Sequence, residues 1–242
     1  MKVKNYIPNI LTLGNLLCGT IATIYAIYED FNSAAVFVLI GILLDFFDGF
    51  VARLLKVSGD LGKQLDSLAD MVTSGVVPGL IMFQLINANS EIIGINNEFL
   101  LNDSLFGLVL TLGACYRLAK FNLDTRQSDS FIGLPTPAMC LFVISLPLIQ
   151  ENSNLHVVEN LLESNYFLIG ITLLLTFLMN AEISLFSLKF KEYSFAKNYI
   201  KYVFIIVSIL MIIGLQYISI PLIILLYIII SVLQNYKTKE VS

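Results

Sequence analysis

The stretch that decides the fold is residues 41–80, which read GILLDFFDGFVARLLKVSGDLGKQLDSLADMVTSGVVPGL. It joins one apolar run, 34–55, to another, 66–87, through a short polar connection. Each run has the length of roughly 20 mostly apolar residues that a helix needs to cross a hydrocarbon core about 30 Å thick. We therefore predict two membrane helices joined by a tight turn.

The rest of the chain also has the composition of a membrane protein. Of its 242 residues, 57% are hydrophobic and 13% are charged, against about 45–50% and about 25% in soluble proteins. This composition excludes a disordered chain and a nucleic-acid binder. We expect an all-α integral membrane protein, a single domain over 1–242, with about eight transmembrane helices at 7–28, 34–55, 66–87, 100–121, 133–150, 166–187, 199–215 and 217–234. The three cysteines lie inside apolar runs without a metal-binding motif, so we expect them to be packing residues.

The basic residues check this count independently, because Lys and Arg collect in cytoplasmic loops. With eight helices, all 14 basic residues fall at the chain ends or near alternate loops: Lys2, Lys4, Arg53, Lys56, Lys63, Arg117, Lys120, Arg126, Lys189, Lys191, Lys197, Lys201, Lys237 and Lys239. The other loops contain acids and no base. Both termini are therefore predicted to be cytoplasmic. The lone histidine, His156, falls in an outer loop, where we expect no chemical role.

Nearly all the charge inside the predicted helices lies on either side of the turn. Asp45 and Asp48 are three residues apart on one helix, and Asp66 and Asp70 are four apart on the next, so each pair shares one helical face. The connection 57–62 is short and rich in Gly and Ser, which predicts that the two helices are antiparallel neighbours. Four carboxylates are then expected to converge near the cytoplasmic membrane surface.

Such a cluster needs a cation, because carboxylates in a medium of low dielectric repel one another. Oxygen ligands alone favour Mg²⁺ or Mn²⁺, and these ions usually serve phosphate chemistry. Four carboxylates suffice for two ions that bridge a diphosphate. The opposing interpretation is that these acids are the solvated ends of two helices, paired with Arg53 and Lys63. Two face-matched acid pairs on adjoining helices favour the metal site.

Several residues around the turn stand at a fixed spacing: Asp48, Gly49, Ala52, Arg53, Gly62, Asp66 and Asp70, with Asp45 preceding them. This pattern resembles the signature of the CDP-alcohol phosphatidyltransferase family. The resemblance implies an integral membrane enzyme that transfers a phosphatidyl group from a CDP-linked lipid to an alcohol and releases CMP. It further implies a catalytic core over about 1–190, a helical pair at 199–234 added to it, an inner-membrane location with the active site facing the cytoplasm, and a homodimer.

Carried over position by position, the resemblance also implies roles for individual residues. The divalent metals, Mg²⁺ or Mn²⁺ and two in number, would be held by Asp45, Asp48, Asp66 and Asp70. Asp70 and Asp66 would be the catalytic residues, and Asp70 would be the base that takes the proton of the acceptor hydroxyl. The CDP group would contact Asp45, Gly49, Ala52, Arg53 and Gly62. For Asn15, inside the first predicted helix, a contact to the cytidine or diphosphate competes with a hydrogen bond between helices.

A more specific resemblance lies in four flanking segments, 7–19, 64–78, 117–122 and 131–137. They are similar to the bacterial and archaeal phosphatidylserine synthases. This implies CDP-diacylglycerol and L-serine as substrates, with phosphatidylserine and CMP as products. Thr73 and Ser74 depart from the Ser and Phe expected at those positions, and Lys120 stands where Arg is more usual.

A zwitterionic acceptor needs a cation for its carboxylate and an acid or carbonyl for its ammonium. Arg117 and Lys120, with Asn122 just beyond them, lie at the inner end of the fourth predicted helix and are the candidate acceptor contacts. The alternative is that both cations merely extend to the interface as positive-inside residues. Glu182, in the inner half of the sixth predicted helix, is either functional or an interfacial acid.

Two rival functions stay open. The same reaction with glycerol 3-phosphate or inositol phosphate as acceptor would need a stronger basic pocket, to which Arg117, Lys120 and Arg126 could contribute. A cation transporter could use the four aspartates as its ion site. Transporter sites normally lie near the membrane midplane on broken helices, whereas these acids gather at one membrane face, which favours the enzyme.

Overall fold

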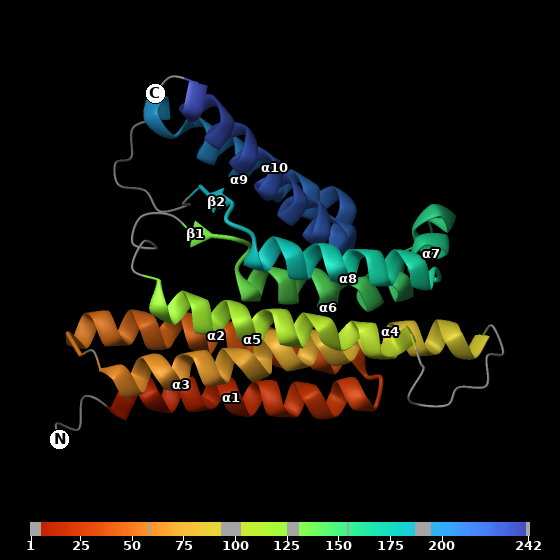
Figure 1. The fold of residues 1–242 in the computed structure, drawn as a ribbon, viewed down its shortest axis with the longest axis horizontal. Helices are drawn as coiled ribbons and strands as arrows, with labels where there is room; N and C mark the ends of the chain where they lie inside the picture. The colour runs from red at the N-terminus through yellow and green to blue at the C-terminus, as the bar shows by residue number, and fades with distance from the viewer. Residues whose placement is uncertain are drawn as a thin grey trace.

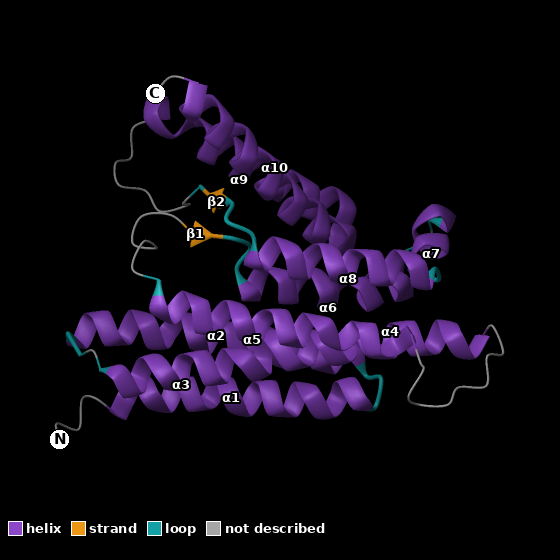
Figure 2. Ribbon diagram, viewed as in Figure 1, coloured by secondary structure: helices purple, strands orange, loops and turns teal. Residues whose placement is uncertain are grey.

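The computed structural model of the chain describes residues 6–57, 59–92, 103–124, 131–153, 155–186 and 195–240. These residues are almost entirely helical (Figure 1 and Figure 2). The α-helices are α1 (Tyr6–Ile27), α2 (Phe31–Leu55), α3 (Asp60–Met71), α4 (Val77–Ile92), α5 (Val109–Leu123), α6 (Thr136–Asn152), α7 (His156–Leu162), α8 (Asn165–Asn180), α9 (Phe195–Leu215) and α10 (Ser219–Glu240). A π-helical turn, η2 (Val72–Val76), joins α3 to α4, and the 3-10 turns η4 (Asp103–Leu108) and η5 (Gln216–Ile218) precede α5 and α10. The prediction of an all-α protein is confirmed.

The helices form two layers, with a hairpin beyond them (Figure 1). In one layer α1 contacts α2, α3 and α4, and α5 contacts α3 and α4; α6 and α8 form the second layer. Large apolar side chains are fully buried in the core of these layers, among them Ile81 of α4, Leu110 of α5, Met139 of α6 and Leu168 of α8. The rings of Phe204 in α9 and Tyr227 in α10 have centroids 5.8 Å apart, so these two helices fold back on each other.

The structure also bears on the number of membrane spans. Among the described residues, five helices are long and apolar enough to cross a membrane, and a sixth is added if α7 and α8, bent by 75°, count together. This is fewer than the eight predicted. The α9–α10 hairpin counts once in that number, as Asn198–Asn235, and α6 has only 17 residues. The eight-span count therefore stays a prediction.

The first two helices pack closely because both present small residues. Cys18, Ala22 and Ala26 of α1 and the Ala34–Ala35 pair of α2 are buried, and small residues let helix backbones approach. Asp30 begins α2, since its Oδ1 accepts the backbone N–H of Ser33 at 3.0 Å. That hydrogen bond lowers the pKa of Asp30 below its ordinary value, because it favours the charged form.

The third predicted helix, 66–87, begins six residues earlier than expected, at Asp60, and contains the π-helical turn η2. Proline explains this turn. Pro78 has no N–H to donate to Ser74 four residues back, and the N–H of Val77 bonds the carbonyl of Val72, five residues back. Side chains of neighbouring helices donate to two carbonyls of the turn: Cys140 Sγ to Thr73 at 3.5 Å and Thr111 Oγ1 to Gly75 at 3.0 Å.

The predicted end of the sixth helix, 166–187, is wrong, because α8 stops at Asn180. Beyond it lies an unpredicted antiparallel pair of two-residue strands, β1 (Phe131–Ile132) and β2 (Ser184–Leu185). Gly133, at a φ of +75°, donates its N–H to the carbonyl of Ile183 at 2.8 Å. This competing backbone pairing takes the chain out of the helix, so Glu182 lies in the connection to β2 and not inside a helix.

Membrane topology gives the first testable prediction. The start of α1, the end of α10 and the α2–α3 connection lie at the same end of the molecule (Figure 1). The predicted topology rests on the basic residues, five of which lie outside the described residues: Lys2, Lys4, Arg126, Lys189 and Lys191. The test therefore uses described positions. In a variant without its three cysteines, Tyr28→Cys should react with an impermeant maleimide from outside and Leu123→Cys should not, as all the basic residues mark the other side. The two side chains are 79% and 84% exposed.

Both positions lie at helix ends, so their accessibility is matched and only the side of the membrane differs. Labelling of Leu123→Cys from outside, or protection of Tyr28→Cys until the membrane is permeabilised, would contradict the predicted orientation.

Candidate active site

Three aspartates converge at one end of the first helical layer. Asp45 and Asp48 come from α2 and Asp66 comes from α3, and one carboxylate oxygen of each lies within 4.8 Å of the others. α1 supplies a contact that sequence reasoning missed, because Thr12 Oγ1 donates to Oδ2 of Asp48 at 2.5 Å. The convergence expected from the spacing is thus found for this aspartate triad.

The aspartate triad fits a divalent metal. Its ligands are all carboxylate oxygens, which hard cations such as Mg²⁺ prefer. Oδ1 of Asp45 is buried and has no hydrogen-bond partner among the described residues, and a buried polar atom of this kind calls for an unseen ligand or ion. Three anions this close also need a positive charge between them.

Asp70 lies one turn beyond Asp66 on α3, where its carboxyl interacts with that of Asp45 and also has a partner on α1. Its Oδ1 accepts a hydrogen bond from Nδ2 of Asn15 at 3.2 Å, and Oδ1 of Asn15 accepts one from Oγ1 of Thr73 at 2.8 Å. Asn15 and Thr73 are both fully buried. Of the two interpretations of Asn15, the structure shows the hydrogen bond between helices, and its contact to CDP stays a prediction.

A cavity of about 800 Å³ opens beside the aspartate triad. It is formed by the start of α1, the end of α2 and the start of α3, and its lining includes Asp48 and Asp66. Four of the residues predicted to contact CDP line it: Gly49, Ala52, Arg53 and Gly62. Asn15 and Asp45, also predicted for CDP, are not among the lining residues. The volume is in the range of pockets that hold small ligands, roughly 300–1,000 Å³.

Helix packing explains why a cavity forms there. α2 and α3 are joined by a short connection that begins at Lys56. This residue has a left-handed φ of 52°, and its backbone N–H donates to the carbonyls of Ala52 and Arg53 at the end of α2. However, α1 packs more closely on both helices than they pack on each other. The space left between α2 and α3 becomes the cavity. Sequence reasoning missed three residues that line the cavity, Asn9 of α1 and the cations Lys56 and Lys63. The two lysines could have been found as bases that lie between Arg53 and Asp66 in the chain.

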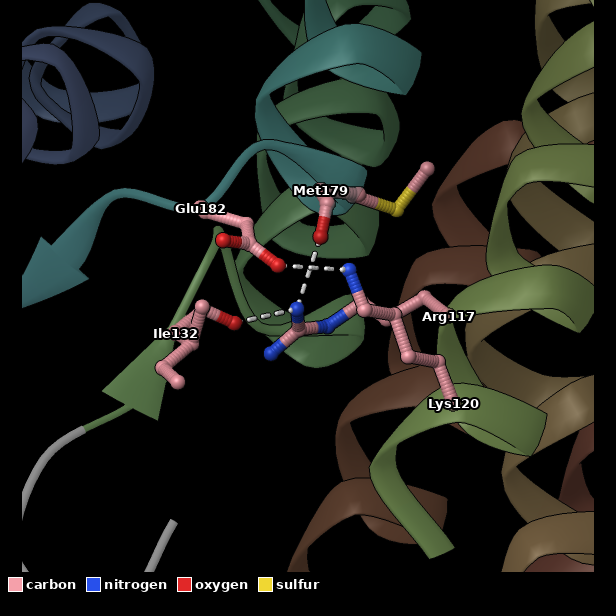
Figure 3. Close-up of polar contacts among 5 residues, drawn as sticks. All are labelled: Arg117, Lys120, Ile132, Met179 and Glu182. Carbon is pink, nitrogen blue, oxygen red and sulfur yellow. Dashed lines mark hydrogen bonds and ion pairs between the residues drawn. The ribbon is translucent and has the colours of Figure 1, made fainter. Parts of the chain in front are cut away.

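The candidate acceptor residues have protein partners in this structure (Figure 3). Arg117 is buried, and its Nη1 donates to the carbonyls of Ile132 at 2.8 Å and Met179 at 2.7 Å. These bonds tie α5 to β1 and to the end of α8. Lys120 is more exposed, and its Nζ lies 3.5 Å from Oε1 of Glu182. Their acceptor-binding role is a prediction that these contacts do not test.

Asn122, the third candidate, connects α5 to α3. Its Nδ2 donates to Oγ of Ser67 at 2.8 Å, and its backbone carbonyl accepts from Nζ of Lys63 at 2.6 Å. Ser67 follows Asp66 directly in the chain, so Asn122 holds the end of α5 against the part of α3 that carries the aspartates.

Comparison with known proteins agrees with this geometry. The sequence model of the CDP-alcohol phosphatidyltransferase family matches residues 5–179. The chain belongs to this family. As a CDP-alcohol phosphatidyltransferase, it has the aspartate triad, the adjoining cavity and Asp70 within the matched segment, whereas α9 and α10 lie beyond it.

The relatives of this CDP-alcohol phosphatidyltransferase point to one branch. It is 38% identical over 143 residues to the CDP-diacylglycerol–serine O-phosphatidyltransferase of Bacillus subtilis, a match that covers 58% of this chain and 76% of that protein. It is 36% identical over 146 residues to the enzyme of the same name from Helicobacter pylori, and here 60% of this chain and 58% of the other are covered. The archaetidylserine synthase of Methanothermobacter thermautotrophicus is 28% identical over 149 residues, which cover 60% and 59%.

The bonds of Arg117 give the second testable prediction. Arg117→Met should lower the thermal stability of the purified protein, because it leaves the buried carbonyl of Met179 and the partly buried carbonyl of Ile132 without this donor. An unpaired buried polar group costs about 1–3 kcal/mol. Lys120→Met is the matched control, since its exposed ion pair with Glu182 is worth about 0–1 kcal/mol. Thermal unfolding in detergent measures both variants. An unchanged Tm in Arg117→Met would contradict this structural role.

Proposed function

We propose that this chain transfers the phosphatidyl group of CDP-diacylglycerol to L-serine and so produces phosphatidylserine and CMP. The observation that carries the proposal is the aspartate triad beside a cavity of about 800 Å³, in a chain that belongs to the CDP-alcohol phosphatidyltransferase family. Serine is supported by the relatives, since the Bacillus and Helicobacter proteins are CDP-diacylglycerol–serine O-phosphatidyltransferases.

The metal set is part of the proposal. Asp45, Asp48, Asp66 and Asp70 would hold two divalent ions, Mg²⁺ or Mn²⁺, which when bound neutralise the diphosphate and the CMP that leaves. The structure supports the first three of these residues as neighbours. One oxygen of Asp70 accepts the hydrogen bond from Asn15, and the Asp70 carboxyl also interacts with that of Asp45, which supports Asp70 as part of the same cluster.

The side chains of the protein account for the acceptor's activation. A serine hydroxyl is a weak nucleophile at neutral pH, so a carboxylate must take its proton during attack. Asp70 is the proposed base. The hydroxyl oxygen forms a bond to the β-phosphorus, the bond between that phosphorus and the oxygen bridging to the CMP phosphorus breaks, and CMP leaves with the bridging oxygen.

The position of the cavity suits a substrate that is half lipid and half nucleotide. Arg53, Lys56 and Lys63 line the cavity and supply positive charge for the phosphates. On α2, Phe46 and Phe50 stand two residues before and two residues after Asp48 with exposed rings, an apolar surface where acyl chains can remain in lipid. We propose that this site faces the cytoplasm at the inner membrane and that the enzyme is a homodimer, as the family resemblance implies.

The phosphorylated acceptors are less well supported than serine. They would need several cations for a second phosphate, and the buried Arg117 is committed to two backbone carbonyls. Arg126 lies outside the described residues. Lys120 is more exposed than Arg117. Glu182 beside it supplies the acid that a serine ammonium requires.

An acceptor screen tests the proposed reaction. Purified protein with CDP-diacylglycerol and Mg²⁺ should release CMP in the presence of L-serine, and neither glycerol 3-phosphate nor inositol phosphate should support release. Asp66→Asn should reduce the rate by at least about 10²-fold, because it removes both a metal ligand and its charge.

The control for the acceptor screen is Asp103→Asn, which makes the same change on η4, far along the chain from the motif, and should keep the wild-type rate. CMP release with a phosphorylated acceptor but not with serine would overturn the acceptor assignment. A near-wild-type rate in Asp66→Asn would overturn the role of the aspartate triad.

Lys120 gives a separate prediction about serine binding. Lys120→Ala should raise the KM for serine by about 10- to 150-fold, the value of one charge-assisted hydrogen bond, and should leave the KM for CDP-diacylglycerol nearly unchanged. Lys201→Ala, on α9, removes a lysine outside the family match and should change neither constant. An unchanged serine KM in Lys120→Ala would leave Lys120 as a topological anchor only.

A further inference from the structure

Two buried polar side chains, Asn15 and Thr73, form a chain of hydrogen bonds that ends at Asp70, and the proposed reaction gives neither of them a role. Nδ2 of Asn15 donates to Oδ1 of Asp70 at 3.2 Å, and Oγ1 of Thr73 donates to Oδ1 of Asn15 at 2.8 Å. We propose that Asn15 and Thr73 are positioning residues, which fix the orientation of the Asp70 carboxylate, and that Asn15 does not contact CDP. This inference rests on the proposed function, in which Asp70 serves the reaction.

The hydroxyl of Thr73 determines which way the Asn15 amide faces. A carboxamide has one end that donates and one that accepts. With Thr73 donating to Oδ1, the NH₂ group faces Asp70, whose carboxylate can only accept when it is ionised. The flipped amide would place its oxygen against the carboxylate oxygen of Asp70. Thr73 therefore acts on Asp70 through Asn15.

Packing around the pair leaves no room for a ligand. A Cβ added at Gly41 of α2 would lie 2.9 Å from Oδ1 of Asn15 and 3.0 Å from Cγ2 of Thr73, and one added at Gly19 would lie 2.9 Å from the backbone of Thr73. Both side chains are fully buried, and neither is among the residues that line the cavity. These observations favour a positioning role for Asn15 over contact with CDP.

The π-helical turn supports the pair from the other side. Thr73 lies in η2, where its carbonyl accepts Sγ of Cys140 at 3.5 Å. Its hydroxyl also lies 3.2 Å from the backbone carbonyl of Asn15. Helices α1 and α6 thus both contact Thr73, and a buried amide with all these partners satisfied stays in one orientation.

The decisive experiment compares Thr73→Val with Thr73→Ser. Valine has the shape of threonine without the hydroxyl, so Thr73→Val should lower kcat by roughly 3- to 10-fold, the value of one buried hydrogen bond. The KM for CDP-diacylglycerol should not change. Thr73→Ser keeps the hydroxyl and should recover most of the rate. Equal losses in both variants would show that packing, and not the hydrogen bond, matters at this position.

Thr111→Val is the matched control. Oγ1 of Thr111 donates to the carbonyl of Gly75 in the same turn at 3.0 Å, so the same substitution removes a hydrogen bond from η2 without touching the pair. It should keep kcat close to the wild-type value. A loss as large as that of Thr73→Val would attribute the effect to general loosening of η2 and would overturn the proposal.

Two further variants separate positioning from binding. Asn15→Leu should lower kcat at least as much as Thr73→Val, and a rise in the KM for CDP-diacylglycerol instead would overturn the proposal by showing that Asn15 binds CDP. In an Asp70→Ala background, Thr73→Val should cause no additional loss, because its effect passes through Asp70. An undiminished loss there would also overturn it.

The assay uses whichever acceptor supports CMP release in the acceptor screen. A wrong acceptor assignment would therefore appear in the wild type, whereas failure of the positioning proposal would appear only in the comparison among variants. Thermal unfolding of each variant confirms that it is folded.

Discussion

Holding three carboxylates within 4.8 Å of one another costs free energy, and the surrounding helices can be understood as the means of offsetting that cost. α1 lies against both α2 and α3, and from α1 Thr12 donates to Asp48. Gly49, Ala52 and Gly62 line the cavity beside the triad. A divalent cation between the carboxylates would offset their repulsion and would tie the fold of this end of the protein to its ligand.

The parts of the fold that could be predicted are those governed by apolar run length. The first predicted helix, 7–28, corresponds to α1 (Tyr6–Ile27), and the second, 34–55, to α2 (Phe31–Leu55). The start of α3 was missed because its first turns are polar and amphipathic, so they fall outside any apolar run. The strand pair β1–β2 could not be foreseen, since two residues contain no periodicity and their partners lie far apart in the chain.

The same distinction applies to the candidate site. The aspartates and small residues follow from their spacing along two short helical segments, and the structure places Asp45, Asp48 and Asp66 together, with Asp70 against Asp45. Arg117 carries a charge that suggested a ligand, but its partners are backbone carbonyls 15 and 62 positions away. The link from Asn15 to Thr73 joins positions 58 apart. Neither contact has a signature in the residue types themselves.

The π-helical turn allows one continuous helix to face two different environments. Each residue of an α-helix advances about 100° around the axis, so a single extra residue at η2 rotates everything after it by about that angle. α3 can therefore direct Asp66 and Asp70 toward α1 and α2, while α4 directs Ile81 and Ile86 into the apolar core. In an uninterrupted helix the phase that suits the aspartates would set the phase of the core as well. The turn at Pro78 thus lets the orientation of the aspartates and the orientation of the core residues be set independently, whereas in one regular α-helix each would fix the other.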